Sequence, residues 1–225
     1  MAKLTNKTLT EETYSAIKER IFKNEYKPGD PLSIENLAEN LGVSQTPIRE
    51  ALIRLSNDGL VEYNPRKKAR VSDITTKDIT ETYEVRKILE PYVASNAAAN
   101  PPIGELKELK KELEEIKQLN GEEKYQKFHE TDIRLNDLLM DTVNNNLLLQ
   151  LFSHIENYNI RIRFFAGTTL KNSEEVVEEG NSDHISIVSA LLDKSPQRAK
   201  HAVLDHLQKA EQRTWQAVKQ EKDSR

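Results

Sequence analysis

The chain has no cysteine among its 225 residues. This absence excludes disulfide bonds, thiolate catalysis and cysteine-based metal sites, and it fits a reducing cytosol. The sequence also lacks a charged leader followed by an apolar segment, and it has no apolar run of about 18 residues. We therefore predict neither secretion nor a membrane partner, and we expect a cytoplasmic protein.

Glycine and aromatic residues are scarce. Seven glycines and eight prolines do not favour a loop-rich all-β fold, and aromatic residues make up 6% of the chain. A hydrophobic content of 36% is enough for helical cores. At this length we expect one large or two small domains, mainly α-helical.

The net charge of −4 is unevenly distributed. Residues 1–75 contain 12 Lys and Arg against 11 Asp and Glu, whereas residues 76–225 contain 21 against 26. The basic excess of the first part gathers near residues 66–70. Local clustering of positive charge matters more for contact with nucleic acid than the charge of the whole chain.

The segment 41–55 has the pattern of a helix-turn-helix. Gly42 follows an apolar-periodic helix and is placed to end it in a left-handed conformation. Ser44 can cap the next helix, and Pro47 is tolerated in a first turn. The inward face of this second helix, which we expect from Ser44 to Asp58, consists of Ile48, Ala51, Leu52 and Leu55.

Short polar side chains remain at the exposed start of this second helix. They suit a helix N-terminus inserted into a DNA major groove. The candidate DNA-binding residues are Ser44, Gln45, Thr46 and Arg49. A helical hairpin with a glycine turn is also a common packing motif, so the segment alone does not decide between the two interpretations.

The flanking residues predict a winged helix-turn-helix. We expect a helix from Thr10, as N-cap, to Asn24, and another from Ser33 to Asn40. Two short strands, 60–63 and 69–71, enclose a basic turn whose candidate DNA-binding residues are Arg66, Lys67 and Lys68. An ordinary solvated turn is the alternative for this basic run, but its place after a helix-turn-helix favours phosphate contact.

Residues 10–75 resemble the GntR family of bacterial transcription regulators. The resemblance rests on the sequences Gly-Val-Ser at 42–44, Thr-Pro at 46–47 and Arg-Glu-Ala-Leu at 49–52. It implies operator contacts by Ser44, Thr46 and Arg49. Gln45 stands where the family usually has Arg, and a Gln can read adenine where Arg reads guanine. The family also often has Arg near position 35, where this chain has Glu35.

Residues 76–225 predict a second domain, an all-α bundle of six or seven helices without strands. The first helix begins near Thr76, and Pro91 either bends it or stands in the first turn of another. Leucines and an isoleucine at spacings of three and four mark the next helix, from Leu106. The remaining helices are expected at 124–143, 146–165, 174–193 and 196–222.

Polar residues on the inward faces of three of these helices are candidate metal ligands. Asp132 and Asn136 are four residues apart on one helix, and His184 and His206 stand on two later helices. Their residue types and faces could bring an acid, an amide oxygen and two imidazoles to one point. For each histidine alone, a hydrogen-bonded core position is the simpler interpretation.

The second part resembles the helical FCD-type effector domain of the FadR subfamily. The resemblance rests on residues 83–90, on Asp132 with Leu135-Asn136-Asp137, and on Asp183-His184 with Ile187. It implies that Asp132, Asn136, His184 and His206 hold a divalent metal ion. Asn136 stands where His is commoner, which predicts weaker binding, or an octahedral site for Zn, Ni or Mn. His129 is an alternative ligand that does not fit the pattern.

We therefore predict a homodimeric, DNA-binding transcription regulator, most simply a repressor, and not an enzyme. A small carboxylate effector is expected to bind at the metal, with candidate contacts from Arg86, Arg161 and Arg163. For Arg161 and Arg163 a surface role is equally compatible, and Arg86 could instead form a salt-bridged helix face with Glu90. The alternatives are a metal-dependent hydrolase, which leaves residues 1–75 unexplained, and a regulator that senses the metal itself.

Overall fold

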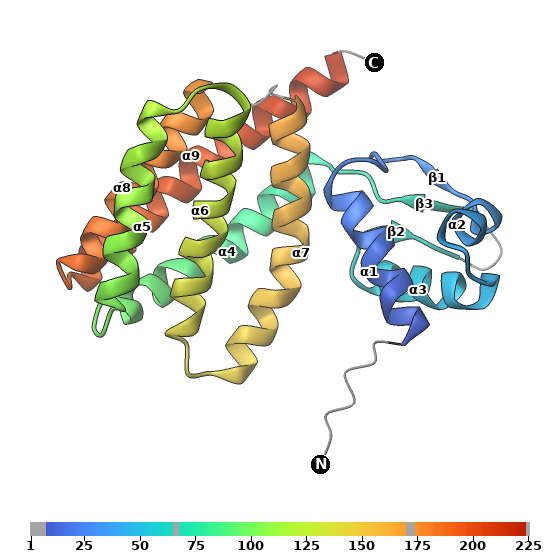
Figure 1. Ribbon diagram of the computed structural model, residues 1–225, viewed down its shortest axis with the longest axis horizontal. Helices are drawn as coiled ribbons and strands as arrows, with labels where there is room; N and C mark the ends of the chain where they lie inside the picture. Colours follow the sequence, from blue (N-terminus) through green and yellow to red (C-terminus); the bar gives the residue numbers. More distant parts are fainter. Residues whose placement is uncertain (1–7, 65–67, 170–173, 224–225) are drawn as a thin grey trace. The chain divides into compact units, whose positions relative to one another are not determined.

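A computed structural model describes residues 8–64, 68–169 and 174–223 (Figure 1). The chain divides into two compact units. Unit 1 contains Met1–Thr75 together with Glu156–Phe165, and unit 2 contains Thr76–Ile155 together with Ala166–Arg225. Helices dominate both units, so the prediction of a mainly α fold is confirmed.

Unit 1 begins with helix α1, Leu9–Phe22. Its N-cap is Thr8, whose hydroxyl accepts a hydrogen bond from the Glu11 backbone N–H while Thr8 N–H donates to the Glu11 carboxylate. This reciprocal capping box satisfies two backbone N–H groups at once. The predicted cap, Thr10, is therefore wrong; its hydroxyl donates to the Glu50 carboxylate instead.

The helix-turn-helix is formed by α2, Ile34–Leu41, and α3, Gln45–Asn57. Gly42 ends α2 with φ +66°, the left-handed conformation expected from its place in the sequence. Glycine adopts this conformation without a steric penalty. Ser44 is the N-cap residue of α3, but its side chain makes no capping hydrogen bond, which corrects that part of the prediction.

A three-stranded antiparallel sheet completes this part of unit 1. Its strands are β1, Pro31–Leu32, β2, Val61–Glu62, and β3, Ala69–Val71, with β3 in the middle. The predicted hairpin corresponds to β2 and β3. Strand β1 was not predicted from the sequence, because Pro31 was assigned to a turn. Proline has no backbone N–H, but β1 is an edge strand of the sheet, where a proline is tolerated.

The core of unit 1 is continuous across the helices and the sheet. It contains the four apolar α3 residues predicted from periodicity, all of them fully buried. They pack with side chains from α1, α2 and the strands, among them Ile17, Leu37, Leu60 and Val71. This packing fixes the orientation of α3 and leaves its opposite face open to solvent.

Within the described residues, unit 2 is built from six α-helices, one of which, α7, contributes its segment Glu156–Phe165 to unit 1. They are α4, Thr76–Ala97; α5, Ile103–Glu115; α6, Gly121–Asp141; α7, Asn146–Thr169; α8, Glu174–Leu192; and α9, Pro196–Asp223. A short 3-10 turn, η1, Ile116–Gln118, follows α5. The prediction that the second domain is all-helical is therefore confirmed for the described residues.

Helix α9 packs along both α4 and α8, and α8 packs in turn against α5 and α6 (Figure 1). Pro91 lies inside α4 and is buried, so the helix continues through it. Among the residues that the structure describes, no helix is both long enough and apolar enough to cross a membrane.

Candidate functional site

The start of α3 presents polar side chains to solvent. Ser44, Gln45, Thr46 and Arg49 are all exposed, as the predicted DNA contacts require. The Arg49 guanidinium donates to the Gln45 side-chain oxygen over 3.3 Å, so the two predicted base-reading groups lie side by side. Their role in reading DNA remains a prediction.

A hydrogen bond links α1 to the C-terminal end of α3. The Tyr14 hydroxyl donates to the Asp58 carboxylate over 2.5 Å, and the Arg54 guanidinium lies 4.6 Å from the Tyr14 ring centre. Burial, and then the neighbouring Asp58 carboxylate, raise the pKa of Tyr14 well above its ordinary value. The phenol therefore stays protonated and keeps donating at any physiological pH.

The wing is described only in part. Lys68 is exposed at the start of β3. The next cation along the strand, Arg70, makes a bidentate pair with Glu62 on β2, at 2.9 and 3.0 Å. Arg66 and Lys67, the other predicted wing contacts, lie outside the described residues.

In unit 2 three helices bring an acid and two imidazoles together. Asp132 on α6 places a carboxylate oxygen 3.4 Å from Nε2 of His184 on α8. The ring centres of His184 and of His206 on α9 are 4.9 Å apart. His184 is 1% exposed, whereas Asp132 and His206 are half-buried beside it. The sequence therefore identified three side chains that the fold brings together.

Two further charged residues belong to this cluster, and sequence reasoning missed both. Asp183 is buried, with one carboxylate oxygen 2.5 Å from the Lys209 ammonium and the other 3.6 Å from Nδ1 of His206. Burial opposes ionisation of Asp183, but the neighbouring His206 imidazole and the hydrogen-bonded Lys209 ammonium outweigh it and hold its pKa below the usual range. The spacing of Lys209, three residues after His206, places the two side chains on the same face of α9, and this pattern could have identified Lys209.

An aromatic ring closes one side of the cluster. Phe128 on α6 stacks on the His184 imidazole, with ring centres 5.2 Å apart and planes inclined by 14°. Gly180 on α8 makes room for this ring, because a Cβ at that position would lie 2.6 Å from the Phe128 Cζ atom. No pattern in the sequence indicated that this glycine supports the histidine.

The fourth predicted ligand, Asn136, is half-buried on α6. Its amide nitrogen donates to the Asp132 backbone carbonyl over 3.0 Å. Within the part of the chain that the structure describes, no three His, Cys, Asp or Glu side chains form a group ready to hold a metal ion. The predicted ligands are thus neighbours, while their use as a metal site remains a proposal.

The three candidate effector-binding arginines have different surroundings. Arg86 is buried, donates to Glu90 and lies 4.9 Å from the Tyr83 ring centre. Arg161 is buried within unit 1, where it donates to the Ser72 carbonyl. Arg163 is half-buried. Their contact with an effector remains untested.

A winged helix-turn-helix with an exposed polar face, followed by a separate helical unit, defines a DNA-binding transcription regulator. The chain belongs to the gntR family of bacterial regulatory proteins, whose family model matches residues 9–71. The FCD domain model matches residues 81–209. The prediction of a GntR helix-turn-helix domain with an FCD domain is confirmed, and the FadR subfamily is consistent with it.

Relatives with known names support this assignment. The chain is 32% identical to the HTH-type transcriptional regulator YdhC of Bacillus subtilis (strain 168), over 86% of this chain and 85% of YdhC. It is 22% identical to the HTH-type transcriptional repressor RspR of Escherichia coli (strain K12), over 96% of this chain and 92% of RspR.

The fold is likewise shared. The solved structure of E. coli McbR/YncC superposes with a TM-score of 0.75 at 22% identity, covering 95% of this chain and all of that one. Because the chain belongs to a family of transcription regulators, the hydrolase alternative is set aside.

Proposed function

We propose that this regulator is a cytoplasmic, homodimeric repressor released from its operator by a small carboxylate that binds at a metal site in unit 2. The observation that carries the proposal is the convergence of the half-buried Asp132 and His206 on the buried His184, from three helices. A relative named as a repressor supports the direction of control.

The donor set fits a divalent metal ion. One carboxylate, two imidazoles and the Asn136 amide oxygen are ligand types that suit Zn, Ni or Mn. Asp183 faces Nδ1 of His206, and a carboxylate on one ring nitrogen orients the other nitrogen for coordination. A bound divalent metal would supply positive charge that attracts an anionic effector to this cluster.

Thermodynamic linkage limits what such an effector can do. It shifts operator affinity only if it binds the DNA-competent state and the released state with different affinities. In a regulator that senses the metal itself, the metal ion alone would bind the two states with different affinities and so change operator affinity. The proposal therefore requires operator affinity to depend on the carboxylate when the metal content is constant.

The exposed face of α4 supports a homodimer. Val85, Ile88 and Tyr92 recur at helical spacing and are 40, 71 and 60% exposed. An apolar stripe of this kind is typical of a protein interface. A second copy is the partner we propose, because a two-fold operator needs two winged helices.

The test is a binding titration on a duplex that the protein itself selects from a random library. We expect two chains per duplex, and affinity that falls when acetate, lactate, malate or citrate is added to zinc-loaded protein. Metal is measured by elemental analysis of protein purified without added metal.

The matched variants are His184→Ala and His201→Ala. His201 is an exposed histidine on α9. His184→Ala should lose metal and the carboxylate response while still binding the duplex, and His201→Ala should behave like the parent. Full metal occupancy in His184→Ala would show that the ligand assignment is wrong.

A further inference from the structure

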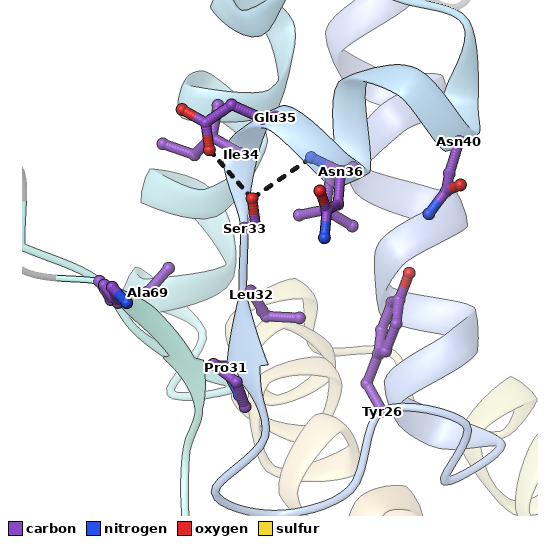
Figure 2. Close-up of a pocket in the computed structure, with 11 residues that line it drawn as sticks. Tyr26, Pro31, Leu32, Ser33, Ile34, Glu35, Asn36, Asn40 and Ala69 are labelled. Atoms are coloured by element: carbon purple, nitrogen blue, oxygen red, sulfur yellow. Dashed lines mark hydrogen bonds between the residues drawn. The ribbon is translucent and has the colours of Figure 1, made fainter.

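A groove of about 790 Å³ opens beside the start of α2 in unit 1 (Figure 2). Its polar lining includes the side chains of Ser33, Asn36, Asn40 and Lys68, which are neutral or positively charged. Among the described residues that line it, Glu35 is the one acidic side chain. Neutral donors and a lysine suit a nucleic-acid backbone, and Glu35 opposes that preference.

The Glu35 carboxylate is held at the N-terminus of α2. It accepts a hydrogen bond from the Ser33 hydroxyl over 2.9 Å, and the same Ser33 oxygen accepts from the Asn36 backbone N–H (Figure 2). A helix N-terminus is a favourable place for an anion. Here the chain supplies that anion from its own sequence.

Glu35 is fully charged at neutral pH. Its own backbone N–H, then the Ser33 hydroxyl and the Arg49 guanidinium, hold the pKa of this carboxyl below its ordinary value. Arg49 stands at the exposed start of α3, the predicted DNA-reading end. A DNA backbone that approaches this end of the helix-turn-helix therefore meets a fixed negative charge.

We propose that Glu35 is a built-in electrostatic brake that lowers the affinity of this regulator for DNA of any sequence. This proposal rests on the DNA-binding role of unit 1. Because the brake acts on phosphates and not on bases, it weakens operator and random DNA by a similar factor. Such a brake makes release from DNA easier without altering which bases are read.

The test compares Glu35→Gln with Glu39→Gln. Both variants remove one negative charge from an exposed position on α2, but Glu39 lies in the last turn and does not line the groove. Affinity is measured for a random 30-base-pair duplex and for a duplex selected by the parent protein, at several KCl concentrations. Thermal unfolding verifies that both variants are folded.

Glu35→Gln should bind both duplexes about three- to tenfold more tightly at low salt, and the gain should shrink as salt screens the charge. Glu39→Gln should give less than half that gain. Equal gains would mean that only net charge matters, and weaker binding by Glu35→Gln would mean that the carboxylate supports the DNA-binding surface; either result overturns the proposal. Absence of salt-sensitive binding by the parent would instead contradict DNA binding itself.

Discussion

In unit 1 the described side chains expected to contact DNA are exposed, whereas in unit 2 those expected to hold a metal are buried or half-buried. Gln45 and Arg49 are exposed on a helix whose other face forms the core. His184 and Asp183 are buried and contact other charged or aromatic side chains. Exposed polar groups are hydrated by water until a partner binds, but buried polar groups must form hydrogen bonds or ion pairs with one another or bind a ligand.

This contrast has a practical consequence for mutagenesis. Replacing an exposed reader should change DNA binding and leave the free energy of unfolding almost unchanged. Replacing a member of the buried cluster should alter its neighbours as well.

The largest effect is expected from the core that orients α3. Leu52 is fully buried, so Leu52→Ala should lower the free energy of unfolding by about 2–5 kcal/mol through lost burial and a residual cavity. Denaturant unfolding measures the loss. Ile53, the next residue, is 48% exposed, and Ile53→Ala should change stability by less than about 1 kcal/mol. Similar losses in the two variants would contradict the assigned faces of α3.

Arg49→Ala tests the surface side of the comparison. It should weaken binding to the selected operator by about 1–3 kcal/mol, because one base-reading guanidinium is removed. Its unfolding curve should match that of the parent. Lys23→Ala, which removes an exposed cation outside α3 and the wing, is the control. If both variants lose the same affinity, Arg49 acts only through its charge.

Asp183→Asn tests the buried side, and it depends on the proposed metal site. An amide in place of the carboxylate should orient His206 less firmly, which should weaken Zn²⁺ binding about tenfold. Competition with a chromogenic chelator measures the affinity. Asp193→Asn, at an exposed aspartate paired with Arg198, should leave it unchanged. An unchanged affinity in Asp183→Asn would exclude a positioning role.

Sequence periodicity predicted the helices well because helix formation is largely local. Gly42 marked the turn, and the α3 apolar residues gave the correct buried face. One error was local, within the first turn of a helix, and the other came where two segments of the chain had to be compared. Thr8 rather than Thr10 caps α1 because Glu11 reciprocates, and Pro31 joins a sheet because β3 lies beside it.

The candidate metal ligands were predicted in part. A resemblance to a known domain identified Asp132, His184 and His206, and the fold brings them together. Asp183 belongs to the pattern that carries the resemblance, but the resemblance assigned it no role, and Gly180 was not part of it. Their importance comes from neighbours on other helices, Lys209 and Phe128, and helical spacing within α8 does not report such neighbours.

The sequence by itself thus determined the order of elements, the helix-turn-helix and the family, because short-range patterns of apolar, capping and turn residues are sufficient for these. Which polar residues are buried, and which groups they contact there, became clear from the packed fold. It showed that Asp183 faces His206 and that Glu35 occupies the start of α2 beside a groove. Burial and charge pairing depend on residues distant in sequence, and packing alone determines which of them meet.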